Sequence, residues 1–206
     1  MQVLVGDCSG EKQVTKIKQN GWGRMVCQNL IYPFDGEPWG FDNGAYVDWV
    51  RDRPFDEVKY MARLWRVYAY GRPYLAVVPD IVGKGKESLE YSMWWRPRLP
   101  DSWPWYLAVQ DGMEVEDVAK VLDNRFAGVF LGGTDFFKKR AEEWCRLAHR
   151  KQKLFHYGRC GTPRKVRHAK RIGADSIDSS FPLWTNERWD EFERTVFERN
   201  EQLELV

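Results

Sequence analysis

The chain alternates short apolar runs with amphipathic segments along its length, and this alternation limits its possible folds more than any other feature. Runs such as "YLAVVPDIV" (74–82), "WYLAVQDG" (105–112) and "AGVFLGG" (127–133) contain stretches of consecutive apolar residues. Continuous apolar strands are buried on both faces, which is typical of parallel sheets whose strands are connected by helices. The pattern therefore predicts an α/β fold.

About eight strands of this kind can be counted, and most of them precede a helical pattern. Eight units are the number needed for a closed barrel, and a chain of 206 residues leaves no room for an appended domain. We predict a compact (β/α)8 TIM barrel as a single domain over residues 1–206. The alternative is an open doubly wound sheet, for which "GDCSGEK" (6–12) is a weak phosphate loop. The predicted strands cover 1–7, 24–32, part of 39–46, 74–82, 105–112, 127–133, 153–158 and 174–180.

The segments between these strands have helical periodicity. Within 55–71, apolar residues recur at helical spacing at Val58, Met61, Leu64, Trp65 and Tyr68, which predicts that this side of the helix faces the core. The predicted helices cover 11–20, 55–71, a segment from about 87, 115–124, 135–151, 162–173 with Thr162 as N-cap and Pro163 in its first turn, and 186–200.

Composition excludes several classes of protein. The formal net charge is +2, so any contact with nucleic acid must come from a local basic patch. The N-terminus lacks the basic region of a signal peptide, and no apolar run approaches the roughly 18 residues of a membrane span. We therefore expect a cytoplasmic protein without membrane contact.

The four cysteines are dispersed at Cys8, Cys27, Cys145 and Cys160. No two of them form a CxxC pair, and no HxH or HxxxH pair accompanies them, so the spacing predicts neither a zinc site nor a disulfide framework. Reduced thiols are the simplest interpretation. We expect no metal and no redox cofactor.

Polar residues or glycines mark the carboxyl ends of six predicted strands. In a TIM barrel these ends meet on one face, where such folds place their active sites. A single aspartate at a strand end is often only a helix cap, but several in equivalent positions indicate a site. The residues are Asp42, Asp80, Gln110, Asp111, Gly132, Gly133, His156, Asp175 and Asp178.

Paired carboxylates on either side of a sugar carbon are suited to double displacement, in which one is the nucleophile and the other the general acid and base. A further aspartate can accept hydrogen bonds from the N1–H and 2-amino groups of a purine, and a glutamine or backbone N–H can donate to its O6. Clustered carboxylates can instead hold a metal, but the histidine stands alone at its strand end.

The segments "FDNGAY", "PDIVG", "AVQDG", "FLGG" and "HYGRCGTPRKVRHAKRIGADSIDSS" resemble, in order, the motifs of the tRNA-guanine transglycosylase superfamily, from about residue 40 to 181. This resemblance implies a TIM barrel that exchanges guanine in a polynucleotide for a 7-deazaguanine base. It makes Asp42 the general acid and base and Asp178 the nucleophile. It assigns binding of the base to Asp80, Gln110, Gly132 and Gly133, beside Asn43 and His156, whereas Asp175 is expected to be a structural hydrogen-bond acceptor.

The chain also departs from the tRNA-modifying members of that family. Those members carry a zinc site of three cysteines and a histidine after the nucleophile, but no Cys or His follows Asp178 here. Asn43 and Ala45 also differ from the tRNA-type motif. These departures resemble the short branch linked to 7-deazaguanine in DNA, so we expect DNA as the substrate rather than tRNA and a base such as preQ0. A tRNA enzyme that needs a partner and a catalytically silent nucleic-acid-binding barrel are the alternatives, and a homodimer remains open.

The segment "RCGTPRKVRHAKR" (159–171) is strongly basic. It can be either a solvated outer helix face or a set of phosphate contacts beside the nucleophile. The candidates for nucleic-acid binding are Arg159, Arg164 and Arg167, of which Arg159 is favoured because it directly follows a strand. His156 can equally be a base-site residue or a satisfied histidine at a strand end.

Overall fold

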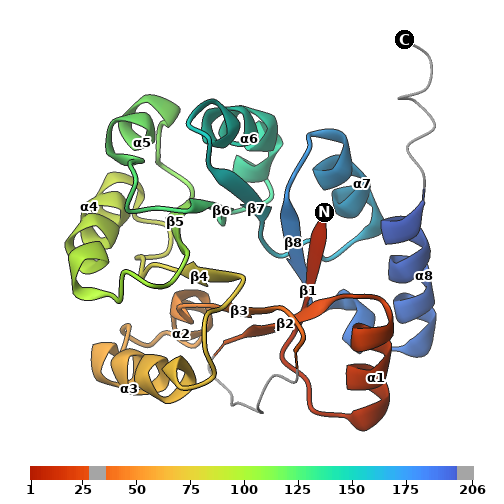
Figure 1. Cartoon of the computed structure of the whole chain (residues 1–206). Coiled ribbons are helices and arrows are strands. Elements are labelled where there is room, and N and C mark those ends of the chain that lie inside the picture. Colours follow the sequence, from red (N-terminus) through yellow and green to blue (C-terminus); the bar gives the residue numbers. More distant parts are fainter. Residues whose placement is uncertain (28–35, 199–206) are drawn as a thin grey trace.

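The structure is a computed structural model of the chain, and it describes residues 1–27 and 36–198. Its eight strands are all parallel and form a closed barrel in sequence order, because β8 also pairs with β1 (Figure 1). This confirms the predicted (β/α)8 barrel. The strands are β1 (Gln2–Gly6), β2 (Gly23–Val26), β3 (Trp39–Phe41), β4 (Leu75–Val77), β5 (Trp105–Val109), β6 (Gly128–Leu131), β7 (Leu154–Tyr157) and β8 (Ser176–Ser179).

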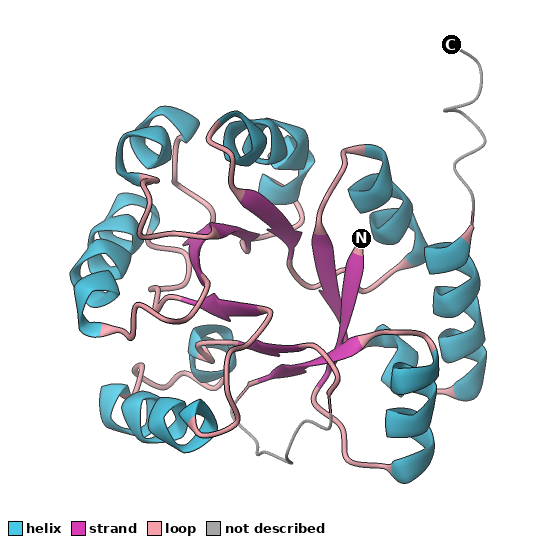
Figure 2. Ribbon diagram, viewed as in Figure 1, coloured by secondary structure: helices cyan, strands magenta, loops and turns pink. Residues whose placement is uncertain are grey.

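Helices surround the barrel on the outside (Figure 2). Two helices rather than one follow β3, and the short α2 was not predicted because its first two residues, Ala45 and Tyr46, belong to the segment 39–46 that was assigned to a strand. The predicted second strand ends at Val26, and its last predicted residues, 28–32, lie outside the described residues. The helices are α1 (Glu11–Gln19), α2 (Ala45–Val50), α3 (Glu57–Tyr68), α4 (Gly85–Trp95), α5 (Val115–Val121), α6 (Ala141–Arg150), α7 (Pro163–Arg171) and α8 (Asn186–Phe197), with short 3-10 turns η1 (Arg96–Arg98), η2 (Phe137–Arg140) and η3 (Phe181–Leu183).

Side chains fill the inside of the barrel, as they do in this fold generally. A small buried cluster includes Leu4, Met25 and Tyr106. Glycines make room for these side chains: a Cβ atom on Gly128 would meet the Tyr106 ring and would lie 2.6 Å from the carbonyl oxygen of Leu154. The interior of the barrel is therefore a packed core rather than an open channel.

The side of α3 that faces the core agrees with the prediction only at Leu64, which is buried, and at Met61, which is partly buried and packs against the core. Val58, Trp65 and Tyr68 are 80%, 54% and 38% exposed, so assigning them to the core was wrong. Both sides of this helix carry large apolar residues, and periodicity alone did not distinguish them. The buried residues are Tyr60, Leu64 and Val67, of which Tyr60 packs against an aromatic cluster containing Phe41, Phe55 and Trp95.

The predicted start of α7 is confirmed. The Thr162 hydroxyl accepts a hydrogen bond of 3.3 Å from the backbone N–H of Lys165, and Pro163 occupies the first turn. All four cysteines are free thiols. Across residues 1–27 and 36–198, none of the helices has both the length and the apolar character needed to cross a membrane.

Candidate active site

Two of the predicted catalytic carboxylates share one environment at the mouth of the barrel. Asp42 directly follows β3, and Asp178 lies within β8. Burial raises the pKa of Asp42, and the negative charge of Asp178 raises it further. Because this effect weakens with distance, the two carboxyl groups lie near each other at the mouth, although their strands are far apart in the chain.

Asp178 is held through one of its two carboxylate oxygens. Its Oδ1 lies 2.9 Å from His156 Nε2 and accepts a hydrogen bond of 3.0 Å from the backbone N–H of Arg159. His156 is itself fixed, because its Nδ1 lies 2.8 Å from Ser176 Oγ and its ring stacks on Phe130 at 4.8 Å. No described group hydrogen-bonds to Oδ2. This second oxygen is therefore the one available for attack.

Asp42 is held from the side of β3. Its Oδ1 accepts a hydrogen bond of 2.6 Å from the N–H of Gly44. The guanidinium of Arg63, on α3, donates to the backbone carbonyls of Asp42 and Asn43 at 3.0 and 2.8 Å and lies over the Phe41 ring. Arg63 thus fixes the Asp42 loop without neutralising its carboxylate directly. Sequence reasoning missed Arg63, which lies in the middle of a helix with no motif around it.

Asp80 lies beyond β4 and is 9% exposed. Its two oxygens accept hydrogen bonds from different side-chain amides, at 2.7 Å from Asn43 and at 2.6 Å from Gln110. Burial raises the pKa of Asp80 to about 6, although both amide hydrogen bonds act in the opposite direction. Asp80 is therefore a carboxyl whose charge is sensitive to pH near neutrality.

The side-chain amides of Asn43 and Gln110 form most of their possible hydrogen bonds with other residues of the protein. The Gln110 amide nitrogen faces Asp80, the Ser88 hydroxyl at 2.8 Å and the Ile81 carbonyl at 3.1 Å, while its oxygen accepts from the N–H of Gly83. The Asn43 oxygen accepts from the N–H of Ala45 at the start of α2. In this arrangement both amides orient Asp80.

The two glycines after β6 differ in their backbone groups. The N–H of Gly132 already donates to the Val109 carbonyl at 2.9 Å. Gly133 has a φ of +74°, and a Cβ atom there would lie 2.8 Å from both Asp111 and Phe137, so only glycine fits without strain. Asp111 supports this turn by accepting hydrogen bonds from the N–H and hydroxyl of Thr134, at 2.6 and 2.5 Å.

The loop after β7 reaches across the mouth. Arg159 has a φ of +51°, its guanidinium donates to the Gly133 carbonyl, and it lies 4.1 Å from the centre of the Tyr46 ring on α2. Beneath this loop, buried Lys138 donates to the carbonyl of Gly158. Burial lowers the pKa of Lys138 to about 7. Sequence reasoning missed Lys138, because its basic neighbours suggest a solvated helix face.

The remaining candidates are Asp175, Arg164 and Arg167. Asp175 precedes β8 at the opposite end of the barrel, where it accepts a hydrogen bond of 2.7 Å from the N–H of Phe155, which confirms its structural role. Arg164 is exposed in the first turn of α7. Arg167, further along α7, forms an ion pair of 2.7 Å with Glu198. The structure therefore places Arg159 at the mouth but not Arg167.

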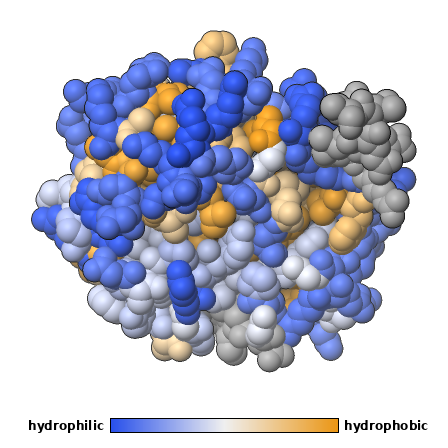
Figure 3. Space-filling model, turned by 45° about the horizontal axis from the view of Figure 1, so that its top comes forward, coloured by the Kyte–Doolittle hydropathy of each residue, from blue (hydrophilic) through white to orange (hydrophobic). Residues whose placement is uncertain are grey.

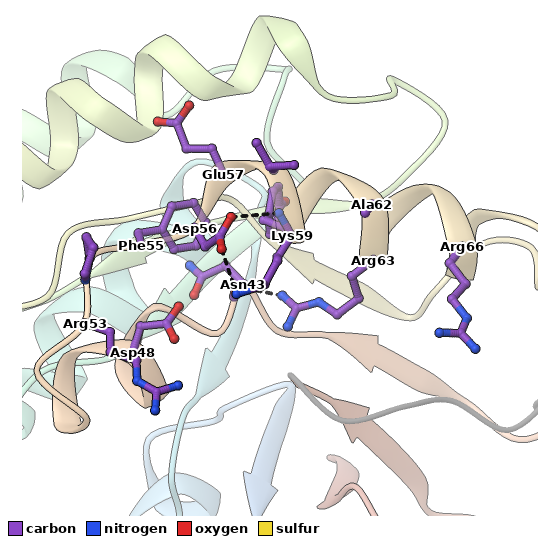
Figure 4. A pocket seen from close by; sticks show the side chains of 13 residues that line it. Asn43, Asp48, Arg53, Phe55, Asp56, Glu57, Lys59, Ala62, Arg63 and Arg66 are labelled. Atoms are coloured by element: carbon purple, nitrogen blue, oxygen red, sulfur yellow. Dashed lines mark hydrogen bonds and ion pairs between the residues drawn. The ribbon is translucent and has the colours of Figure 1, made fainter.

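A cavity of about 770 Å³ lies beside the mouth, between α2 and α3 (Figure 4). Asn43 lines it on the side of the barrel, and Arg53, Arg63 and Arg66 line it elsewhere. The acidic residue Asp56 in its wall pairs with Lys59 at 2.9 Å. Through Asn43, the cavity adjoins the loop after β3 that carries Asp42.

The residues at the mouth are suited to acid–base and nucleophilic chemistry at one carbon. Within the described parts of the chain, no group of three or more His, Cys, Asp or Glu residues is arranged to hold a metal ion. No protein-family model matches this chain, and no curated protein matches it.

Proposed function

We propose that this protein is a guanine transglycosylase that exchanges guanine in DNA for a 7-deazaguanine base such as preQ0. The observation that carries the proposal is the pair Asp42 and Asp178, whose carboxyl groups interact electrostatically at the mouth and have different hydrogen-bond partners. The order of the sequence motifs supports the same assignment. The proposal extends to DNA rather than tRNA because Asn43 and Ala45 depart from the tRNA-type motif.

In the first displacement, Oδ2 of Asp178 attacks C1′ of the target nucleotide while the bond from C1′ to the guanine nitrogen breaks. The raised pKa of Asp42 keeps this carboxyl protonated to higher pH, so it can give its proton to the departing guanine. In the second displacement, the Asp42 carboxylate takes a proton from the incoming base, whose nitrogen attacks C1′ and releases Asp178. Two inversions at one carbon preserve the β-configuration.

Asp80 fits recognition of the purine edge, because a buried carboxylate is the acceptor that the N1–H and 2-amino groups need. Asn43 and Gln110 hold that carboxylate in place. The backbone N–H of Gly133 is suited to donating a hydrogen bond to O6 of the purine. The target base has to leave the stack before C1′ comes within reach of Asp178.

The test is the exchange of labelled guanine into single-stranded DNA, duplex DNA and tRNA by the wild type and by Asp178→Asn. The variant keeps the shape of the side chain and removes its nucleophilic charge, so we expect neither exchange nor a covalent adduct. Asp135→Asn is the matched control, because Asp135 is exposed and its ion pair with Lys165 lies outside the proposed chemistry. Exchange by Asp178→Asn at the wild-type rate would refute the assignment, exchange into tRNA alone would favour the tRNA enzyme, and binding without exchange would favour the silent barrel.

A further inference from the structure

Three large aromatic side chains are exposed on segments that follow the carboxyl ends of strands, on the same side of the barrel as Asp42, Asp80 and Asp178. Trp49 on α2 is 57% exposed, Phe136 before η2 is 76% exposed, and Trp184 after η3 is 63% exposed. We call these residues the rim aromatics. Side chains of this size are normally buried to a greater extent, and the chemistry proposed above uses none of them.

Cations accompany the rim aromatics. Lys139 Nζ lies 5.1 Å from the centre of the Phe136 ring, and the Arg188 guanidinium lies 4.5 Å from that of Trp184. Trp49 packs against Tyr46, over which Arg159 lies. Among the described residues, no carboxylate forms an ion pair with Lys139, Arg188 or the Arg159 guanidinium, whereas cations elsewhere, such as Arg125, are paired. The rim therefore combines flat apolar faces with cations whose charge no described carboxylate neutralises through an ion pair.

The charge pattern restricts how a polyanion can lie on this surface. Asp42, Asp80 and Asp178 occupy the centre of the mouth, and this negative charge disfavours a phosphate there. The cations lie on the segments that follow β6, β7 and β8: Lys139 in η2, Arg159 in the loop after β7, and Arg188 in the first turn of α8. A phosphate backbone would therefore follow the rim while one sugar and its base enter the centre. One face of the molecule shows hydrophobic patches set among hydrophilic residues (Figure 3).

We infer that the rim binds an unpaired strand of DNA on either side of the target nucleotide, with bases stacked on Trp49, Phe136 and Trp184 and phosphates at Lys139 and Arg188. This inference rests on the proposed function and specifies its substrate. Paired bases in a duplex are covered by their neighbours in the stack, so only an unpaired strand offers faces to such side chains. Exposed aromatic platforms with interleaved cations are how sequence-tolerant single-strand binding works.

Trp94 provides a matched control within the same chain. It is 46% exposed, and the Arg98 guanidinium lies 3.7 Å from the centre of its ring. It lies in the last turn of α4, however, and α4 runs away from the mouth. Trp94 therefore has the same chemistry as the rim aromatics in a position that the inferred strand does not reach.

The experiment measures binding of a fluorescent thymidine oligonucleotide of about 15 nucleotides, as a single strand and paired with its complement. The probe lacks guanine, so binding is separated from exchange. We expect Trp184→Ala and Phe136→Ala each to weaken single-strand binding by roughly tenfold, and Trp94→Ala to leave it unchanged. The duplex should bind at least about tenfold more weakly. Lys139→Ala and Arg188→Ala should each reduce the salt dependence by about one counterion, whereas Arg125→Ala should not.

Wild-type binding by both rim variants, or equal binding of duplex and single strand, would overturn the inference. Equal binding of a uridine strand would support it, because stacking and charge do not depend on the sugar. If the single strand binds through the rim but labelled guanine is never exchanged, the rim inference stands and the proposed function fails. If guanine is exchanged but the rim variants bind normally, the proposed function stands and the rim inference fails.

Discussion

At the residue scale, the acidic residues at the mouth are chemically distinct because their surroundings differ. Asp80 is buried between two amides, Asp42 lies near a second carboxylate, and Asp178 keeps one oxygen free of described partners. Pairs of carboxyls in different environments are how one site provides both an acid and a base or nucleophile. The hydrogen bonds of each residue therefore matter as much as its identity.

Asp80→Asn should change the pH dependence of stability. The folded pKa of about 6 lies above the ordinary value of 3.8, so between these values the folded chain binds more protons and the wild type loses stability as pH rises. Asparagine removes this loss. We expect the free energy of unfolding of the variant, relative to wild type, to increase by up to about 3 kcal/mol from pH 4 to pH 7.

Denaturant unfolding at a series of pH values measures this difference. The control is Asp135→Asn, because Lys165 lowers the pKa of Asp135 and the difference should then have the opposite sign. A difference between Asp80→Asn and wild type that stays constant with pH would contradict the burial of a titrating carboxyl at this position.

At this scale, sequence reasoning identified residues that lie at or near the end of a strand. Asp42, Asp80 and Asp178 were identifiable because each belongs to a short motif on or directly after a strand. Lys138 and Arg63 were not, since they act by donating to backbone carbonyls, and a backbone acceptor leaves no signature in the sequence. The four groups that hydrogen-bond to Gln110 were equally unpredictable, because Gly83 belongs to the loop before α4 and Ser88 to α4 itself.

At the scale of elements, the loop after β7 connects several parts of the site. Its Arg159 N–H binds the Asp178 side chain, and the N–H of Cys160 binds the Asp178 carbonyl at 2.7 Å. Lys138 supports this loop from η2 through the Gly158 carbonyl. Lys138 can therefore position Asp178, the proposed nucleophile, through the loop after β7.

Lys138→Met should keep the volume and remove the donor to Gly158. We expect kcat for guanine exchange to fall by about 10- to 100-fold with little change in KM, because the nucleophile is misplaced while base recognition remains. The folded pKa of about 7 lies below 10.5, so in the wild type stability rises with pH by about 1 kcal/mol per unit above pH 7, and the variant should lack this rise.

The control for this prediction is Lys151→Met, in the exposed turn after α6. It should retain both the kcat and the pH dependence of the wild type. Unchanged exchange kinetics in Lys138→Met, with the protein folded, would show that Lys138 does not position the loop.

The elements themselves were predictable to different degrees. The start of α7 was correct because a Thr-Pro pair determines capping locally. The prediction that Val58, Trp65 and Tyr68 on α3 are buried was wrong, because these residues are as apolar as the residues of α3 that pack inward. Which side of such a helix is buried depends on tertiary partners, here the aromatic cluster around Tyr60.

At the scale of the whole molecule, the barrel was predictable from the number and order of strand–helix units. Closure itself depends on pairing of the first and last strands, with Leu4 opposite Asp178. This pairing also places Asp178, the proposed nucleophile, in the sheet next to β1. Sequence alone did not reveal how the interior is filled, because Gly23, Gly40 and Gly128 are read locally as turn or strand-breaking residues rather than as space for side chains inside the barrel.

Gly128→Ala should destabilise the entire barrel. The added Cβ would meet the Tyr106 ring and the Leu154 carbonyl, which belong to the neighbouring strand β5 and to β7, and neither can retreat in a closed sheet. We expect the free energy of unfolding to fall by about 2–3 kcal/mol, as for overpacked cores.

Gly161→Ala is the control, because a Cβ there finds only the Arg159 carbonyl at 4.0 Å, and its stability should stay within about 0.5 kcal/mol of wild type. Because every strand is paired on both sides, circular dichroism and tryptophan fluorescence should report the same lowered midpoint for Gly128→Ala. Separate transitions would show that part of the barrel unfolds independently, and an unchanged midpoint would show that the interior has room for the methyl group.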